Sequence, residues 1–428
     1  MTETRRASAS PRTAVRRLAL GRLISVTGGA AAYTALNFTV WDRTHSPGMQ
    51  ALSLLLTFGV AGILGPFAGA LGDRYDRRRV MIASEALASA FFIGMVFVDA
   101  PLILIVLAFG SAISELPFFS ASRAAIPNLV EREEDIAWAN SLITVGVHAG
   151  IAVGPLIGGL IVASAGPKWV FAVNAVSFLI SLMLTIATRG RFADPEREAT
   201  VSGEVEREHQ GITAGIRFLF GEPVLRRMSL AWLVFVLGMG MGMVADAPIA
   251  ESFGTGATGF GLLIAAWGSG SVLGSVAGRW MTARTEPLWV VVGAGTIAIA
   301  AIGVGLAPWF WVVLASLLVM GTADGLTIVA ENGIMQRRTP DAVRSRTMAA
   351  FEALLSLGLF VAYLVAIPLL RAVEPQRIYL IGGIAAAAAA VVLVPLLWLR
   401  REAAEVIELE AEAEVETPVG VAWESRLE

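Results

Sequence analysis

Residues 69–79 read GALGDRYDRRR and lie between two apolar runs, each of about 20 residues and long enough to cross a bilayer. Two acids and four arginines are therefore packed into one short connector between hydrophobic helices. Arginine clusters stay on the cytoplasmic side when a membrane protein inserts, so we expect this connector to face the cytoplasm. Gly65 and Gly69 stand four residues apart on one helical face, where the missing side chains let a second helix approach closely.

The composition indicates a polytopic membrane protein. Of the 428 residues, 56% are hydrophobic and 16% are charged, and the mean hydropathy is +0.70, whereas soluble domains usually carry about a quarter charged residues. The chain has no cysteine, which excludes disulfides, thiolate metal sites and cysteine nucleophiles. Its three histidines lie far apart in the sequence without ligand-like spacing, so we expect no metal site and no cofactor.

Hydropathy, punctuated by glycine, proline and charge, predicts twelve membrane-spanning helices in two groups of six. The expected spans are 18–41, 50–71, 80–98, 102–124, 141–164 and 168–188, and then 228–250, 259–281, 288–306, 309–331, 347–370 and 378–399. We therefore divide the chain into a basic leader (1–17), a first half (18–188), a central loop (189–227), a second half (228–400) and an acidic tail (401–428). The loop is polar at first and then amphipathic over 212–220, which is typical of a membrane-surface helix.

The distribution of positive charge predicts the orientation of these helices. If the N-terminus is cytoplasmic, 26 of the 32 arginines and lysines fall in cytoplasmic segments and only four in the outer loops. Positive charge accumulates on the cytoplasmic side, so we expect both termini to be cytoplasmic. The tail differs, because it contains nine glutamates and one arginine from Glu402 onward. We expect it to be disordered, and a solvated helix is the alternative.

The two halves look like repeats of one unit. Pro127 follows the fourth span and Pro340 follows the tenth, 213 residues later, which is about half the chain. The glycine pair near the end of the second span has a counterpart in Gly274 and Gly278 near the end of the eighth. The aspartate of the first connector is replaced there by Thr282, so the second copy has lost its acid.

The 69–79 connector resembles the loop 2–3 signature of the major facilitator superfamily, G-x-L-a-D-r-x-G-r-[RK]. The matching positions are Gly69, Leu71, Asp73, Arg74, Arg77 and Arg78, while Asp76 replaces the second glycine of the signature. The resemblance implies an all-α polytopic fold of twelve transmembrane helices in two pseudo-symmetric six-helix halves around a midplane site. It is strongest for the enterobactin-exporter and macrolide-efflux-like branch. The alternative is an ordinary cytoplasmic anchor, which would not require the aspartate and glycine spacing.

The resemblance also implies a conformational latch. In the family, the loop 2–3 aspartate docks near the start of helix 11 and holds the outward-open state. If this role applies to the present chain, the latch would dock against the start of helix 11. Its residues would be Asp73, Gly69, Arg74, Arg77 and Arg78. The residues expected on the helix 11 side are Arg344, Arg346 and Glu352.

A second motif lies in the fifth span, where residues 150–159 read GIAVGPLIGG. It matches G-x-x-x-G-P-x-x-G-G, which resembles a helix 5 signature that is associated with export in the drug–proton antiporter branch. We expect the four glycines, Gly150, Gly154, Gly158 and Gly159, to form one bare helix face for close packing. Pro155 favours a kink. Static packing of small residues is the alternative.

Acids within apolar spans are costly and point to function. Glu115, near the middle of the fourth span and two residues before Pro117, is our candidate for the proton-coupling carboxylate. A structural pair with an arginine is the alternative, and the fourth span lacks the intramembrane arginine that antiporters often carry there. Asp246 and Asp324 are further candidates for proton or substrate contact. Asp246 could instead lie at the outer mouth with Glu251.

Aromatic and weakly polar residues on the first and fourth spans predict a cavity for large amphiphilic molecules. These residues are Tyr33, Asn37, Phe38, Trp41, Phe118 and Phe119. For Trp41, at the end of its span, the alternative is a place in the aromatic belt at the membrane interface. For Arg22 we expect a side chain that reaches the cytoplasmic membrane edge rather than a binding role. His148 is expected to be a packed, neutral histidine.

These features predict a secondary active transporter that exports a small amphiphilic molecule by alternating access and proton antiport. A facilitator or importer of the same fold is one alternative, and a membrane receptor or lipid-handling protein is another. We expect no enzyme, because the sequence has no phosphate loop, metal cluster or nucleophile–base set. The expected partners are a small-molecule substrate, protons and the lipid bilayer, without nucleic acid. We expect a monomer in the bacterial cytoplasmic membrane.

Overall fold

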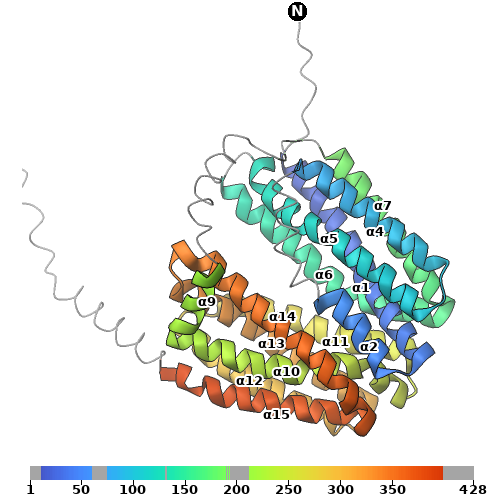
Figure 1. Cartoon of the computed structure of the whole chain (residues 1–428). Helices are drawn as coiled ribbons and strands as arrows, with labels where there is room; N and C mark the ends of the chain where they lie inside the picture. Colours follow the sequence, from blue (N-terminus) through green and yellow to red (C-terminus); the bar gives the residue numbers. More distant parts are fainter. Residues whose placement is uncertain are drawn as a thin grey trace, which may run out of the picture.

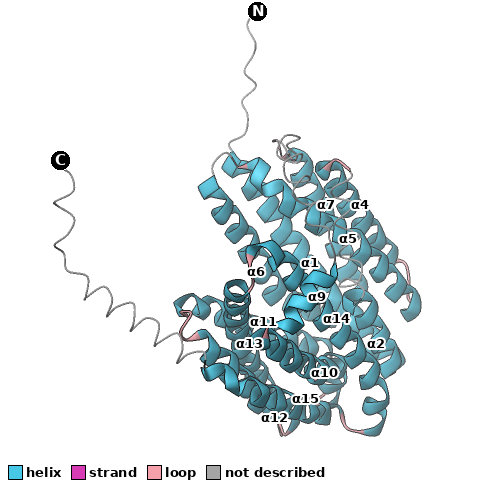
Figure 2. Cartoon of the chain, turned by 60° about the vertical axis from the view of Figure 1, so that its left-hand side comes forward, coloured by secondary structure: helices cyan, strands magenta, loops and turns pink. Residues whose placement is uncertain are grey.

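A computed structural model describes residues 11–59, 75–130, 133–188, 190, 192 and 212–398. Every regular element in these ranges is a helix (Figure 2). The first half contains α1 (Pro11–Thr44), α2 (Pro47–Leu54), α4 (Arg77–Val96), α5 (Pro101–Leu129), α6 (Glu133–Ala165) and α7 (Pro167–Ala187). The central loop contains α9 (Ile212–Gly221), and the second half contains α10 (Pro223–Ser252), α11 (Gly256–Ala277), α12 (Glu286–Gly305), α13 (Phe310–Arg338), α14 (Asp341–Ala372) and α15 (Pro375–Leu393).

The described helices match the predicted spans. Eleven of them are long and apolar enough to cross a membrane, and a shorter apolar helix covers Pro47–Phe58. That shorter helix is α2 and its continuation, the π-helix η1 (Leu55–Gly59), which together form the described part of the predicted second span. The all-α polytopic fold is therefore confirmed. The main differences are at the ends, because α1 begins at Pro11 rather than at 18, α6 begins at Glu133 rather than at 141, and α13 extends to Arg338 rather than to 331.

Local sequence explains where several helices begin. A proline occupies the first turn of α2, α5, α7, α10, α12 and α15, where its missing N–H would have no helical partner. The Asp76 side chain caps α4 by accepting a hydrogen bond from the Arg79 amide at 2.9 Å. Glu222 caps α10 in the same way, accepting from the Leu225 amide at 2.6 Å. These signals are local, so the helix starts could be read from the sequence.

The helices form two bundles with equivalent internal packing (Figure 1). In the first bundle α1 packs against α6 and α7, and in the second α10 packs against α14 and α15. Between the bundles, α6 contacts α11 and α2 contacts α14, so that each half contributes the same two positions to the interface. The predicted pseudo-symmetric halves are therefore present. The predicted surface segment at 212–220 is helical as α9, and it packs against α14.

The glycines of the fifth-span motif have two different partners, so the expectation of one bare face is wrong. Gly150, Gly154 and Gly158 face α1, where an added Cβ would collide with the backbone around Thr27 and Ala31. Gly159 faces α11 in the other bundle, close to the Ala257 carbonyl and Gly261. The reason is the helical period, since residues four apart share a face while adjacent residues are turned by about 100°.

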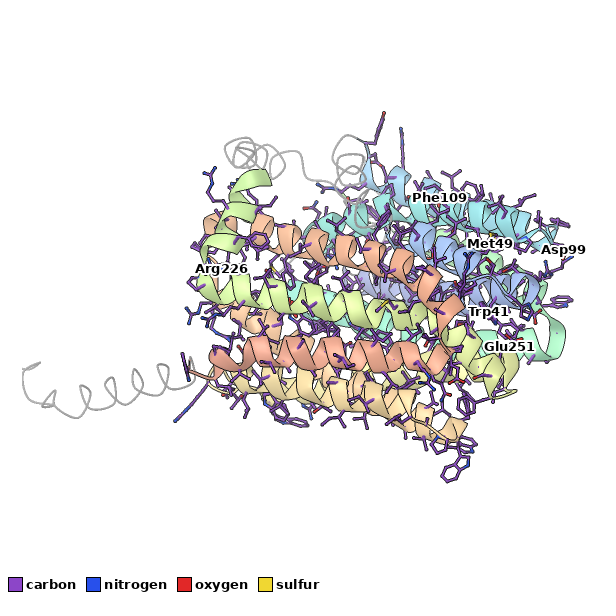
Figure 3. All side chains as sticks on the ribbon, turned by 60° about the horizontal axis from the view of Figure 1, so that its bottom comes forward. Trp41, Met49, Asp99, Phe109, Arg226 and Glu251 are labelled. Atoms are coloured by element: carbon purple, nitrogen blue, oxygen red, sulfur yellow. The ribbon has the colours of Figure 1, made fainter. Side chains whose placement is uncertain are left out.

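The molecule has two opposite ends, which we name by their contents. The terminal face contains the start of α1 and the end of α13, and the loop face contains the end of α1 and the start of α5. Figure 3 shows Trp41, Asp99 and Glu251 at the loop face and Arg226 at the opposite end. At the loop face the Asp99 carboxylate accepts hydrogen bonds from Lys168 at 2.9 Å and Arg43 at 3.1 Å, which together lower the pKa of Asp99.

A second group of contacts at the loop face joins the two halves. The Trp41 indole N–H donates to the Glu251 carboxylate, and His45 Nε2 lies 3.0 Å from Glu251 Oε1. Trp41 and His45 belong to the first half, whereas Glu251 ends α10 in the second. These polar contacts therefore join the two halves at the loop face.

Three residues of the predicted latch, Gly69, Asp73 and Arg74, lie outside the described residues. Of the remaining residues, Arg77 donates to the carbonyl oxygens of Ala124 and Phe192, each at 3.3 Å. Arg78 donates to the carbonyl of Ile186 at 2.5 Å. Both arginines thus tie α4 to neighbouring elements of the first half. The leader before residue 11 and the acidic tail also lie outside the described residues.

Candidate functional site

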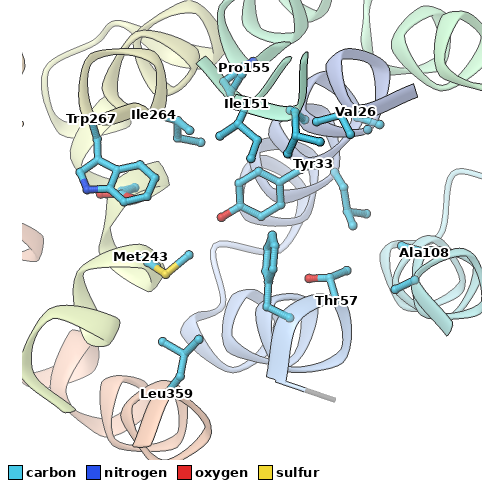
Figure 4. Close-up of a pocket in the computed structure, with 18 of the residues that line it drawn as sticks. Val26, Tyr33, Thr57, Ala108, Ile151, Pro155, Met243, Ile264, Trp267 and Leu359 are labelled. Atoms are coloured by element: carbon cyan, nitrogen blue, oxygen red, sulfur yellow. The ribbon is translucent and has the colours of Figure 1, made fainter. Parts of the chain in front are cut away.

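A cavity of about 700 Å³ lies between the two bundles. Its wall is contributed by α1, η1, α4, α5 and α6 from the first half and by α10, α11, α12, α13, α14 and α15 from the second. A volume of this size suits a drug-sized molecule, for which pockets of roughly 300–1,000 Å³ are typical. The cavity lies on the terminal side of the loop-face contacts, and Figure 4 shows side chains from both halves around one open space.

Most of the cavity wall is apolar and aromatic. Tyr33 and Phe58 meet edge to face with their ring centroids 4.9 Å apart. Met243 and Trp267 project from the second half into the same space as Tyr33 (Figure 4). Further aromatic and methionine side chains in the wall are Phe92, Met95, Phe119, Phe235, Met239, Met320 and Tyr379. Such a wall can bind large apolar groups of varied shape, because aromatic rings and methionines offer broad, adaptable contact.

The predicted lining is correct for Tyr33 and Phe119 and wrong for the other four residues. Asn37 is fully buried, and its amide donates to the Tyr33 carbonyl at 3.0 Å. Phe38 packs against Phe260 of the second half, and Trp41 lies at the loop face. The sequence predicts these residues in the wall because they are aromatic or weakly polar. Phe118 packs instead in the core of the first half, with Leu18 and Met81, whereas Phe38 and Trp41 contact the second half.

Arg22 on α1 is the basic residue of the cavity wall, and its predicted position at the membrane edge is wrong. Only 7% of its surface is exposed. Its guanidinium lies 4.0 Å from the ring centre of Phe119 and 5.2 Å from that of Phe118, in the range of cation–π attraction. The side chain therefore stays inside the first half, where aromatic rings and nearby acids stabilise its charge.

Glu115 lines the cavity on α5 and lies within electrostatic range of Arg22. The fourth span lacks the intramembrane arginine expected of an antiporter, but the fold supplies one from the first span instead. The structure thus brings together an acid and a base that lie 93 residues apart in the sequence. Glu115 is a cavity carboxylate with a basic neighbour, which can exchange a proton with a ligand or with water in the cavity.

Glu85 is a second acid near Arg22 that sequence analysis missed. It lies on α4, is only 3% exposed and does not line the cavity. Its carboxylate accepts hydrogen bonds from Ser181 and, at 3.2 Å, from Thr185 of α7. The sequence did contain a signal for it, because Glu85 is the single acidic residue within the predicted span 80–98.

Asp246 on α10 lines the cavity in the second half, so its alternative position at the outer mouth is wrong. Tyr379 on α15 donates its hydroxyl to Asp246 Oδ1 at 2.6 Å. Tyr33 and Tyr363 lie within electrostatic range of the same carboxylate. Three of the four tyrosines of the chain therefore surround Asp246, whereas Glu251 lies apart at the loop face.

Asp324 on α13 also lines the cavity, as the sequence suggested. Glu331 lies seven residues further along the same helix and within electrostatic range of both Asp324 and Glu352. Pro155 of the fifth-span motif belongs to the wall as well. His148 is exposed, not packed, because it lies about 200° around α6 from Gly146 and Gly150, which face α1.

In the part of the chain that the structure describes, no three histidine, cysteine or acidic side chains group as metal ligands. The candidate site is instead an aromatic cavity with ionisable groups at separate points of its wall. Arg22, Glu115 and the buried Glu85 lie in the first half, while Asp246 and Asp324 lie in the second.

Sequence comparison finds relatives over most of the chain. A profile described as Major Facilitator Superfamily matches residues 18–247 and 239–427. The enterobactin exporter EntS of Escherichia coli O6:K15:H31 (strain 536 / UPEC) is 25% identical over 348 residues, covering 79% of this chain and 81% of the relative. EntS of Shigella boydii serotype 4 (strain Sb227) has the same identity and coverage.

Comparison with solved structures finds the same fold at low sequence identity. A D-xylose–proton symporter superposes with a TM-score of 0.68 at 17% identity, covering 90% of this chain and 97% of the symporter. A bacterial homologue of the iron transporter ferroportin, in an inward-facing state, superposes with a TM-score of 0.67 at 17% identity, covering 91% and 100%. At these identities the likeness concerns the fold alone.

Proposed function

The chain belongs to the Major Facilitator Superfamily, and we propose that it exports a small amphiphilic molecule across a membrane in exchange for protons. Membership in this family makes it a transporter and not an enzyme, as the sequence predicted. The observation that carries the proposal is the aromatic cavity between the two halves, with Glu115 and Arg22 in its wall.

The lining of the cavity supports an amphiphilic substrate. Apolar surface in the wall favours a substrate with a large hydrophobic part, because burial contributes about 25 cal/mol per Å² of apolar area. The few polar groups then orient the molecule. Broad aromatic contact is spread over many weak interactions, so it also allows the transporter to release its substrate.

Two findings favour export over import. The fifth-span motif resembles the signature of the drug–proton antiporter branch, and curated relatives are enterobactin exporters. The fold by itself does not decide the direction, since a D-xylose–proton symporter has the same architecture. We therefore base the direction on the motif and on the sequence relatives.

We propose a bacterial cytoplasmic membrane as the location, with the terminal face toward the cytoplasm. The support is the sequence, in which 26 of the 32 arginines and lysines lie on that side. With this orientation the loop-face contacts close the outer side, and the cavity belongs to a state that is closed outside. We also propose a monomer, because one chain supplies every side chain of the cavity wall.

Proteoliposomes test the proposed transport directly. The purified full-length chain would be given a panel of fluorescent amphiphiles, with and without an imposed pH gradient. We expect the gradient to drive movement of at least one compound against its concentration. Equal movement of a compound without a gradient would indicate a facilitator. If correctly folded, reconstituted protein moves none of the compounds, that result would contradict an exporter of amphiphiles.

The loop-face contacts predict how the outer side opens. Glu251→Ala removes the acceptor for Trp41 and His45, so the outward-open state should become more populated. Hydrogen bonds to a charged group contribute about 1.4 kcal/mol or more. Their loss should therefore change the ratio of the outward-open to the outward-closed state by about tenfold. The chain contains no native cysteine, so Met243→Cys can report access to the cavity.

We expect a membrane-impermeant maleimide, added outside, to label Met243→Cys about tenfold faster when Glu251→Ala is also present. Glu374→Ala is the matched control, because Glu374 is an exposed acid of the loop face that, among the described residues, pairs with Arg377 of the same half. Unchanged labelling in the Glu251→Ala background would show that these contacts do not hold the outer side closed.

The latch residue Asp73 provides a separate prediction. Asp73→Asn removes the charge that would dock at the start of α14, and we expect transport to be lost while expression remains normal. Asp76→Asn is the control, because Asp76 caps α4 through an oxygen that asparagine retains. Normal transport by well-expressed Asp73→Asn protein would contradict the latch.

A further inference from the structure

The cavity carries negative charge that no described basic residue balances. In the first half, Glu115 and Glu85 both lie within electrostatic range of Arg22, and Arg123 adds a second positive charge near Arg22. In the second half, Asp246 and Asp324 line the same cavity. Among the described residues, Asp246 has Tyr379 as its polar partner, and neither Asp246 nor Asp324 has an arginine or lysine beside it.

The arginines of the central loop and the second half are far from this part of the wall. Those that the structure describes lie in α9, in links or close to helix ends: Arg217, Arg226, Arg227, Arg279, Arg284, Arg337, Arg338, Arg344, Arg346, Arg371 and Arg377. A carboxylate removed from bulk water is costly unless it is paired, protonated or hydrogen-bonded. Asp246 has one such hydrogen bond, from Tyr379, and no described base lies beside either acid, so both are free to pair with a positively charged group that enters the cavity.

The surroundings of Asp246 suit an organic cation. Tyr379 donates to one carboxylate oxygen, which orients the group and leaves the other oxygen for a ligand. Tyr33 and Trp267 project into the cavity from opposite halves (Figure 4). Aromatic faces attract ammonium-type cations within about 6 Å, and the attraction increases when water is excluded.

An organic anion has no equivalent place in this wall. Arg22 is the basic residue among the described lining residues, and the carboxylates of Glu115 and Glu85 lie near it together with the second base, Arg123. Phe119 covers its guanidinium at 4.0 Å. Binding an anion at Arg22 would therefore bring it close to Glu115, where like charges repel.

We propose that Asp246 is the centre of a cation-binding subsite in a cavity whose wall also contains Asp324, and that the substrate is an amphiphile with a positively charged group on an aromatic or polycyclic body. This assignment rests on the proposed export of amphiphiles and names the class of molecule that is exported. Asp246 binds the charged group beside Tyr33, and the apolar wall takes the rest of the molecule. Asp324 contributes a second negative charge to the same cavity.

Two ions of nearly equal shape and opposite charge test the subsite. Tetraphenylphosphonium and tetraphenylborate would be measured for equilibrium binding to the purified full-length protein. We expect the cation to bind at least about tenfold more tightly than the anion. Asp246→Asn and Asp324→Asn should each weaken binding of the cation by about tenfold and leave binding of the anion unchanged or stronger.

Three controls separate charge from folding. Asp246→Glu keeps the charge and should retain binding of the cation within a few-fold. Asp135→Asn is the matched acid-to-amide change outside the cavity, since Asp135 pairs with Arg12 at the terminal face. A monodisperse elution profile would establish that each variant is folded.

The outcomes distinguish this inference from the proposed function. Equal binding of the two ions, binding of neither ion, or unchanged binding of the cation to the Asp246→Asn, Asp324→Asn double variant would overturn the cation subsite. Transport of uncharged amphiphiles in proteoliposomes would then leave the export proposal standing. Absence of all gradient-driven transport, with the cation still bound through Asp246, would instead overturn the export proposal.

Discussion

Glu115→Gln is expected to abolish proton-driven transport while the protein remains folded. Glutamine keeps the size of the side chain and its hydrogen-bonding capacity but cannot gain or lose a proton. Glu115 faces the cavity and lies within electrostatic range of Arg22, so its charge responds both to protons and to what fills the cavity. In the variant, Glu85 remains near Arg22 to balance its charge, which should preserve the packing of the first half.

The measurement is transport in proteoliposomes with and without an imposed pH gradient. For the wild-type protein we expect accumulation against the concentration gradient, and for Glu115→Gln we expect only the background of protein-free liposomes. Glu374→Gln, an equivalent change at an exposed acid of the loop face, should transport like the wild type. Gradient-driven accumulation by the Glu115→Gln variant would assign proton coupling to another carboxylate and leave Glu115 a structural role.

The second large effect is expected at Gly158, where α6 lies against the backbone of α1. A Cβ at this position would lie 2.8 Å from the Ala31 Cα and closer still to the Ala31 carbonyl oxygen. The obstacle is backbone, which cannot rotate away as a side chain can. Overpacking of this kind costs about 1–3 kcal/mol. Because α1 and α6 both line the cavity, we expect Gly158→Ala to lower both stability and transport.

The thermal midpoint of the detergent-purified protein, followed by its tryptophan fluorescence, measures this effect. Gly295→Ala is the matched control, because an added Cβ at Gly295 meets nothing within 4 Å. Alanine is also the better helix former by about 1 kcal/mol, so this control should be neutral or slightly more stable. An equal midpoint for Gly158→Ala and the wild type would mean that the two helices are not held this closely in solution.

Most of the fold could be predicted from local signals. Runs of about 20 apolar residues specify spans, because each must satisfy its own backbone within the bilayer. Proline in the first turn and the cap at Asp76 mark helix starts. The glycines of the fifth-span motif correctly indicated close packing, but not that Gly158 and Gly159 would face different partners.

The candidate site was only partly predictable. Glu115, Asp246, Asp324 and Tyr33 were found because polar groups are conspicuous in apolar spans, and all four line the cavity. Arg22 was misread because its distance from the helix end suggested access to water, whereas it lies under Phe119. Asn37 was misread because its polar amide suggested a place in the wall, whereas it is fully buried and donates to the Tyr33 carbonyl of its own helix.

The sequence by itself determined the helices, their number in each half and the kinds of residue that could act in the membrane. Hydropathy and capping are properties of neighbouring residues, so they can be read along the chain. Only the tertiary structure decided which side chains contact one another. It brought Arg22 close to Glu115 and Glu85 of two other helices, joined Tyr379 to Asp246 and left the two cavity acids of the second half, Asp246 and Asp324, without a described base beside them. These pairings depend on helix rotation and on contacts between distant segments, which no local pattern encodes.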